Sequence, residues 1–171
     1  RGAASMATGA DGDGAPAAEG VFVAVRVRPF IQEEYARLPA GQQQPTLCVS
    51  APSAQSLDIT RDGRTQRFDF DRVYWSHNAG HPHFATQATL YQEMGQSLLQ
   101  HMLNGYNTCI FAYGQTGSGK SYSVLGQDTE EGRGLLPRCV QGLFESFDAA
   151  PAGCTCECVV SFLEIYNEQI R

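Results

Sequence analysis

The stretch FAYGQTGSGKSYSVLG, from Phe111 to Gly126, decides the fold of this chain. Its central part, Gly114 to Ser121, matches the pattern G-x-x-x-x-G-K-[ST] at every fixed position. An apolar, β-favouring run from Thr108 to Tyr113 leads into it and predicts a buried strand. The residues KSYSVL that follow can begin a helix. The sequence therefore predicts the strand–loop–helix unit of a phosphate-binding loop.

The chemistry of a phosphate site explains each fixed residue of this pattern. Glycine lets the backbone turn tightly and approach a ligand without a Cβ clash. Successive N–H groups then form a nest for an anion, supported by the positive end of the following helix. Lys120 can bridge the β- and γ-phosphates, and the Ser121 hydroxyl can ligate Mg²⁺. The predicted phosphate-binding residues are Gly114, Gln115, Thr116, Gly117, Ser118, Gly119, Lys120 and Ser121.

Three other interpretations of the glycine-rich stretch are weaker. A flexible linker has a similar composition, but the flanking strand and helix argue against it. A dinucleotide-binding G-x-G-x-x-G is excluded because Gly119 is followed by Lys120, Ser121 and Tyr122. A guanine nucleotide is disfavoured because the tetrapeptide Asn-Lys-x-Asp, with which GTP-binding proteins usually read guanine, does not occur. The sequence therefore favours Mg²⁺ and ATP.

Composition narrows the class of protein further. The 171 residues suffice for one domain with a sizeable core, and no apolar run approaches the ~20 residues of a membrane helix. A net charge of −6 without a Lys/Arg cluster argues against nucleic-acid binding. The six cysteines are interpreted as reduced. The CTCEC spacing is wrong for zinc even with His77, His81 and His83 as further candidate ligands.

The remaining pattern predicts an α/β order of elements. Apolar residues on both alternating faces predict a doubly covered strand over Val21–Val27, which Pro29 ends. Alternation around Asp62-Gly63 predicts a hairpin. Thr86 is the predicted N-cap of a helix that ends at Asn104-Gly105. A second helix is predicted over LLPRCVQGLFESF, and a strand at the start of CVVSFLEIYNEQIR. The predicted apolar stripe of this helix is Leu136, Val140, Leu143, Phe144 and Phe147. Cys109 and Cys139 are expected to pack as small hydrophobes.

The first 20 residues are rich in Ala, Gly and Asp and contain almost nothing to bury. We therefore expect residues 1–20 to be disordered. Met6 is a candidate for the natural start, which would make residues 1–5 an upstream remnant.

Four segments in this order resemble the signatures of a kinesin motor domain: VAVRVRPF, FAYGQTGSGKSYSVLG, GLLPRCVQGLF and FLEIYNEQIR. The resemblance covers the chain from about Val21 to its end. YWSH and NGYNTCIFAYGQTG are most similar to the kinesin-3 group, and HPHFATQ to its mitotic branch. The implied fold is an α/β P-loop NTPase with a mixed central sheet flanked by helices, incomplete in this chain.

The resemblance also implies roles for individual residues. Lys120 corresponds to the catalytic lysine of the phosphate loop. Arg26, Arg28 and Pro29 match the R-x-R-P motif that borders the adenine in kinesins, although ordinary solvation at a strand edge would explain the two arginines on their own. Tyr122 matches an aromatic position that covers the base. EIYNE is interpreted as structural.

The sequence lacks the motifs that are typical of the second half of a kinesin motor domain. The γ-phosphate sensors N-x-x-S-S-R-S-H and D-L-A-G-S-E do not occur, nor do the main tubulin-binding loops and the neck linker. Residues 21–171 are therefore expected to be the N-terminal part of a motor domain. The implied protein is a microtubule-stimulated ATPase in the cytoplasm, on microtubules and the mitotic spindle, without membrane contact, and a homodimer through an absent stalk. The alternative is a truncated, non-catalytic product.

Because strands of the two halves interleave in kinesins, Val21–Val27 and Thr108–Tyr113 are expected to lack a neighbour on at least one edge. Open edges of apolar strands template aggregation. We therefore expect the 171 residues alone to be poorly folded.

Overall fold

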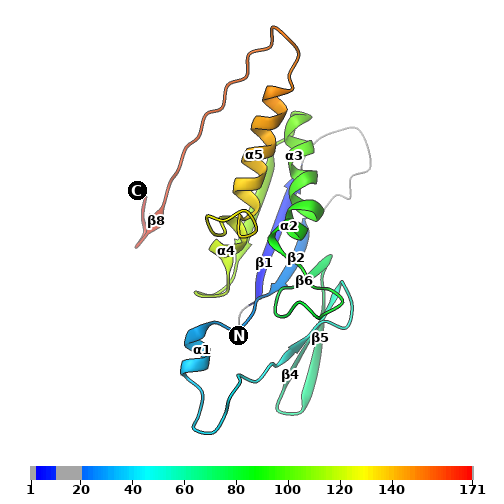
Figure 1. The fold of residues 1–171 in the computed structure, drawn as a ribbon, viewed down its shortest axis with the longest axis vertical. Helices are drawn as coiled ribbons and strands as arrows, with labels where there is room; N and C mark the ends of the chain where they lie inside the picture. Colours follow the sequence, from blue (N-terminus) through cyan, green and yellow to red (C-terminus); the bar gives the residue numbers. More distant parts are fainter. Residues whose placement is uncertain (1–2, 11–20, 171) are drawn as a thin grey trace.

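A computed structural model describes residues 3–10 and 21–170 (Figure 1). Its strands are β1 (Ala3–Ala10), β2 (Phe22–Val27), β3 (Val49–Ser50), β4 (Ser56–Arg61), β5 (Arg64–Asp69), β6 (Arg72–Trp75), β7 (Thr108–Tyr113), β8 (Ile165–Tyr166) and β9 (Gln169–Ile170). Its helices are α1 (Gln32–Ala36), α2 (Gln87–Leu90), α3 (Gln96–Leu103), α4 (Lys120–Val124) and α5 (Leu135–Asp148), with a π-helical turn, η1 (Tyr91–Gly95), between α2 and α3.

The central sheet has four strands in the order β6-β2-β1-β7. β2 and β6 are parallel, whereas β1 is antiparallel to both β2 and β7. In Figure 1 the helices α2, α3 and α5 lie over one side of this sheet. The predicted fold class, a mixed sheet flanked by helices in a P-loop α/β domain, is therefore confirmed, and the predicted strands before Pro29 and at Thr108–Tyr113 are present.

Strand β1 differs from the expectation of disorder over residues 1–20. Ala3–Ala10 pairs with β2 on one side and with β7 on the other. The prediction relied on the lack of apolar residues, but a strand ladder is made by backbone groups, so a segment with little to bury can still pair. As a result β2 is paired on both edges, contrary to expectation, while β7 has a neighbour on one edge only among the residues that the structure describes. Residues 1–2 and 11–20 lie outside the described residues.

Both faces of β2 are covered, as its unbroken apolar pattern predicts. One face belongs to a core cluster under the helices: Ala24, Tyr74, Ala85, Leu90, Met94 and Leu135. The other belongs to a cluster shared with the three-stranded sheet β3-β4-β5: Val25, Val27, Ala51, Leu57, Val73 and Trp75. β2 is therefore buried on two sides, as is β6, and the last residues of β2 enter the site described below.

The local signals of the hairpin and of the long helix are confirmed. Asp62 and Gly63 have φ angles of 51° and 71° in the β4–β5 turn, the values of a type I′ hairpin. The Thr86 hydroxyl accepts the Thr89 N–H at the start of α2. Helix α3 ends at Leu103, and Gly105 follows with φ 87°. The turn η1 between α2 and α3 was not predicted.

Two predicted core faces are exposed in the structure. Alternate residues of β7 are exposed, Cys109 and Phe111 among them, so the expected doubly buried strand is covered on one face only and Cys109 does not pack. Helix α5 buries Leu135 and Cys139, as expected for Cys139, but leaves Val140 and Phe144 exposed. The apolar periodicity predicted the helix correctly. It did not predict which face of the helix packs against the core of the described residues.

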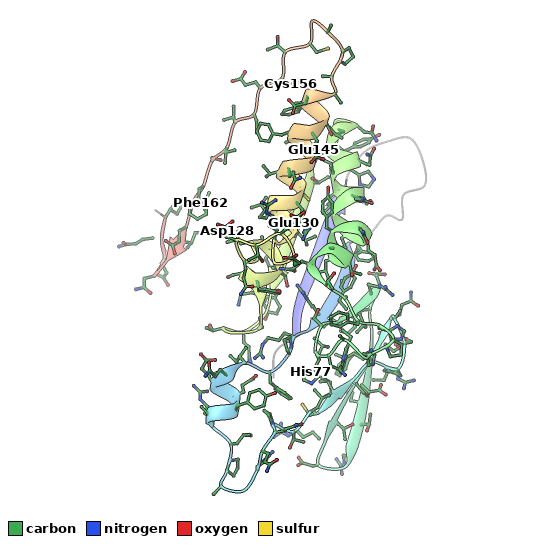
Figure 2. The ribbon with its side chains drawn as sticks, in the orientation of Figure 1. His77, Asp128, Glu130, Glu145, Cys156 and Phe162 are labelled. Carbon is green, nitrogen blue, oxygen red and sulfur yellow. The ribbon has the colours of Figure 1, made fainter. Side chains whose placement is uncertain are left out.

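The predicted strand at the start of CVVSFLEIYNEQIR is absent. Residues 154–164 run back from α5 without secondary structure, and only the two-residue strands β8 and β9 follow (Figure 1). Figure 2 labels Cys156 and Phe162 on this segment, and Phe162 is 91% exposed. The apolar, β-favouring sequence is present, but among the described residues no neighbouring strand pairs with it.

Candidate nucleotide-binding site

A cavity of about 880 Å³ lies where the loop after β7 meets the end of β2. This size is typical of a small-molecule site. Four parts of the chain line it: the residues from Arg26 to Ile31, the segment that enters α2, the phosphate loop with the start of α4, and the loop between α4 and α5. The lining residues are Arg26, Arg28, Pro29, Ile31, Ser76, Phe84, Ala85, Thr86, Gln87, Thr116, Gly117, Gly119, Lys120, Ser121, Tyr122, Gln127, Thr129, Glu131 and Gly132.

The backbone of the phosphate loop has the conformation that its glycines permit. Gly117 and Gly119 have φ angles of 78° and 99°, which L-residues rarely adopt. Gly119 immediately precedes Lys120, the first residue of α4. The Ser118 N–H donates to the Gln115 carbonyl at 3.1 Å, so this amide is used within the loop itself. The Ser118 side chain is buried, and its hydroxyl contacts no hydrogen-bond partner among the described residues.

Lys120 is the only lysine in the 171 residues. Its ammonium donates to the carbonyl oxygens of Gly114 at 2.7 Å and Gln115 at 2.9 Å. These bonds hold the charge over the loop, next to Ser121 at the cavity wall. The arrangement fits a phosphate ligand, because a compact cation and a hydroxyl face the same space as the glycine-rich backbone.

Arg28 connects the phosphate loop to α1. Its Nε donates to the Gly117 carbonyl at 2.8 Å, while its two terminal nitrogens donate to the Glu34 carboxylate. The guanidinium lowers the pKa of Glu34 to about 2. The carboxylate also accepts the Ile31 N–H at 3.0 Å. Arg28 therefore braces the loop from the side of β2, a role that its motif alone did not indicate.

Arg26 is a buried cation, 5% exposed. Its partners are neutral: Ser76, Gln87 and Ser123 accept its N–H groups at 2.7–3.0 Å. Its guanidinium carbon lies 5.2 Å from the centroid of the Tyr122 ring, a cation–π distance. Burial lowers the pKa of Arg26 to about 10, so the side chain stays protonated at neutral pH. The interpretation of Arg26 as a solvated strand-edge residue is therefore wrong.

The structure brings most of the predicted site residues around this one cavity. Those lining it are Arg26, Arg28, Pro29, Thr116, Gly117, Gly119, Lys120, Ser121 and Tyr122. The other three predicted residues do not line the cavity. The Gly114 and Gln115 carbonyls accept from the Lys120 ammonium, and Ser118 is buried. Lys120 and Arg28 contact the phosphate loop, and the Arg26 guanidinium lies over the Tyr122 ring.

Two parts of the cavity wall were not predicted from the sequence. One is the segment from Phe84 to Gln87, whose signals were assigned to a helix start. The other is the loop from Gln127 to Gly132, which reads as a polar connection and carries Asp128 and Glu130 (Figure 2). The first lies in HPHFATQ, which was interpreted only as a sign of the kinesin subgroup, and the second matches no motif. Gln87 is buried and hydrogen-bonded in the structure, but a single polar residue in a predicted helix does not indicate burial from the sequence.

The residues present also fit a magnesium ion. Mg²⁺ keeps several waters and takes few protein ligands beside substrate phosphates. The Ser121 hydroxyl can supply one such oxygen ligand, and Lys120, which also lines the cavity, can bind the phosphates that would supply the others. Among the described residues no group of three or more His, Cys, Asp or Glu side chains is arranged to hold a metal. A metal here would therefore be held together with the phosphates.

The fold and the site define a P-loop nucleotide-binding α/β domain. The comparison with protein families makes this specific: the model of the kinesin motor domain matches residues 26–171. The chain therefore belongs to the kinesin motor domain family. The resemblance is confirmed by relatives of the kinesin-3 group, such as kinesin-like protein unc-104 of Caenorhabditis elegans, which is 40% identical over an alignment of 157 residues that covers 88% of this chain.

Two further relatives carry different names. Kinesin-related protein 1 of Dictyostelium discoideum is 38% identical over 161 residues, and StAR-related lipid transfer protein 9 of Mus musculus is 46% identical over 161 residues. Each alignment covers 88% of this chain but only 7% and 3% of those two proteins. The chain thus spans a small part of the curated relatives that it matches, unc-104 included at 9%.

Solved structures show the same fold. KIF14 with ADP, in complex with a microtubule, has a TM-score of 0.68 and 30% identity, and covers 86% of this chain and 39% of that one. A fast kinesin has a TM-score of 0.58 and 29% identity, over 75% of this chain and 33% of that one. The chain therefore corresponds to less than half of each solved chain.

Proposed function

We propose that these residues are the ATP-binding part of a microtubule-based motor, which couples ATP hydrolysis to movement along microtubules or binding to them. The observation that carries the proposal is the cavity at the phosphate loop, where Lys120, Ser121 and the glycine-rich backbone meet the Arg26–Tyr122 pair. Lys120, Ser121 and the loop backbone suit the polyanionic end of a nucleotide, and the Arg26–Tyr122 pair suits its flat aromatic base.

Within this proposal each wall has its own task. Lys120 holds the β- and γ-phosphates and stabilises the charge that develops on them during transfer. Ser121 holds Mg²⁺, which when bound neutralises phosphate charge. Arg26, Arg28, Pro29 and Tyr122 frame the base, and the residues of the phosphate loop are Gly114 to Ser121. The groups that position water lie outside these residues, because neither sensor motif occurs in the sequence.

The proposed partner is the microtubule, bound through parts of the full-length protein outside this chain. Support comes from the solved KIF14 complexes, one of which is a dimer with AMP-PNP in complex with a microtubule. By the same comparison we propose a homodimer formed outside this chain and a location on microtubules. The proposed place on the mitotic spindle rests only on the segment HPHFATQ. The acidic net charge of −6 gives no support to nucleic acid as a partner. None of the described helices is both long and apolar enough to cross a membrane.

The deciding experiment is ATP turnover by the full-length protein with and without microtubules, compared with Lys120→Ala. We expect the variant to lose at least ~10²-fold in kcat, because a charge that stabilises the transition state is removed. Lys120→Arg is the matched control for charge alone, and it should recover little, because a planar guanidinium does not replace a compact ammonium in a tight loop. Normal microtubule-stimulated turnover in Lys120→Ala would refute the proposal.

A further inference from the structure

Gln87 is a buried polar residue at the cavity, and it ends the segment HPHFATQ, to which the resemblance to kinesins assigned no role in the site. It is the first residue of α2 and is 2% exposed. Its amide oxygen accepts from the Arg26 Nη1 at 2.7 Å. Its amide nitrogen donates to the carbonyl oxygens of Tyr122 at 2.6 Å and Gly132 at 3.1 Å. One side chain therefore joins β2, α4 and the loop between α4 and α5.

The partners of Gln87 fix the orientation of its amide. A guanidinium only donates hydrogen bonds, so it must meet the oxygen of the amide. Two backbone carbonyls only accept, so they must meet the nitrogen. No charged side chain satisfies both sides: glutamate keeps the bond from Arg26 but has no donor for Tyr122 and Gly132. The position thus requires a neutral group with a donor and an acceptor at this length.

The helix start holds Gln87 in place. The Thr86 hydroxyl accepts the Thr89 N–H, and the Thr89 hydroxyl accepts the Thr86 N–H, both at 3.2 Å. This reciprocal cap fixes the backbone from which the Gln87 side chain extends. The side chain then reaches across the cavity wall instead of into solvent.

Arg26 depends on this contact because its charge is buried among neutral groups. Within residues 3–10 and 21–170, no salt bridge to Arg26 is formed. Its Nη1 hydrogens go to Gln87 and Ser123, and its Nε hydrogen goes to Ser76. Loss of the Gln87 oxygen would leave a buried donor unsatisfied, and the guanidinium would leave its place over the Tyr122 ring.

We propose that Gln87 is a positioning residue that holds the base-side wall, defined as Arg26, Tyr122 and Gly132, and thereby sets the affinity for the base of a purine nucleoside triphosphate. The inference rests on the proposed function, because the wall acts on a base only if a nucleotide binds. Gln87 makes no hydrogen bond to Lys120 or Ser121 in the structure. Its effect is therefore on binding of the base and not on phosphate chemistry.

Kinetics separates this role from a merely structural one. A contact that binds the base equally in the ground state and the transition state changes KM and leaves kcat alone. A residue needed only for folding reduces the active fraction, which lowers the apparent kcat and leaves KM unchanged. The two roles thus move different parameters.

The experiment measures MgATP turnover by the full-length protein with Gln87→Met, Gln87→Glu and the matched control Gln100→Met, a glutamine exposed on α3. We expect Gln87→Met to raise KM at least about tenfold, from the loss of three hydrogen bonds, with kcat within about twofold. Gln87→Glu keeps the bond from Arg26, so its KM should lie between those of the wild type and Gln87→Met. Gln100→Met should match the wild type.

A competition assay with inorganic tripolyphosphate makes the test independent of turnover. Tripolyphosphate has no base, so Gln87→Met should bind it as the wild type does while losing ATP affinity. Equal loss of both ligands, an unchanged KM, or a Gln87→Glu variant no better than Gln87→Met would overturn the proposal. If the wild type itself binds no MgATP, the proposed function fails; normal ATP binding in every variant removes only this inference.

Discussion

Arg28 and Glu34 form a two-point ion pair at the edge of the site. The Arg28 Nη1 lies 2.8 Å from one carboxylate oxygen and the Nη2 lies 3.0 Å from the other. The same guanidinium donates its Nε hydrogen to the carbonyl of Gly117 in the phosphate loop. The geometry of that loop is therefore coupled to a carboxylate on α1, 83 residues earlier in the chain than Gly117.

We predict that Glu34→Gln destabilises the full-length protein by roughly 1–2 kcal/mol at neutral pH, because a charge-assisted, bidentate pair is lost. The pKa of Glu34 is lowered from 4.5 to about 2 in the folded state. A lowered pKa gives stability that is present above pH 4.5 and is lost as the pH falls toward 2. The difference between wild type and variant in urea midpoints should therefore shrink over this range.

Urea titrations of both proteins at several pH values between 2 and 7 provide the measurement. Glu33→Gln, an exposed neighbour on the same helix, is the matched control and should show no such trend. A wild-type advantage that stays constant down to pH 2 would show that the ion pair does not form in solution.

The rate at which Lys120 is acetylated can report whether the phosphates of a nucleotide are bound next to it. We predict that MgATP slows acetylation of Lys120 by acetic anhydride at least about tenfold, because an ammonium bound to phosphates is withdrawn from the reagent. Tripolyphosphate should protect as ATP does, whereas adenosine should not. The modified peptide is quantified by mass spectrometry. Protection by adenosine equal to that by ATP would place the lysine at the base instead.

Gly126 closes the loop that forms part of the cavity wall. It has a φ of 77°, and a Cβ there would overlap the carbonyl oxygen of Gly132. Gly126→Ala should therefore cost at least ~2 kcal/mol and weaken ATP binding, because the loop must open. Gly105→Ala is the matched control: its φ is 87°, but nothing lies within 4 Å of the added Cβ, so only about 1 kcal/mol of backbone strain is expected. Thermal melts and ATP titrations of the two variants check this, and equal effects would contradict it.

The 171 residues alone should not melt cooperatively. Within residues 3–10 and 21–170, no strand pairs with the outer edge of β7, Phe111 is 58% exposed and Phe162 is 91% exposed. Apolar surface and an open strand edge of this kind favour aggregation over a unique fold. Circular dichroism on heating, with light scattering in parallel, provides the measurement. A sharp, reversible, concentration-independent transition would show that these residues fold as a unit.

Local sequence patterns predicted the elements with a signal inside their own residues. The glycine spacing gave the phosphate loop, Asp62-Gly63 the hairpin turn, and Thr86 the start of the long helix. Each depends on backbone conformation and on hydrogen bonds within a few residues. The same is true of the site: Lys120 and Ser121 could be assigned because their neighbours in the sequence define their position.

Partners that are distant in the sequence could not be predicted in this way. The pairing of β1, the exposure of Phe144 on α5 and the failure of the segment around Phe162 to form a strand all depend on which surface each element meets. An amphipathic pattern states that a face needs cover, but it does not say which residues cover it.

The sequence by itself determined the phosphate loop, because its residues are contiguous and its geometry follows from local backbone chemistry, and it determined the family, because four ordered segments carry the signatures. Only the tertiary structure decided how the base-side wall is held together. Arg26 and Gln87 are 61 positions apart, and neither residue type indicates burial. Packing removes both side chains from water, and a buried guanidinium then needs acceptors from wherever the fold supplies them.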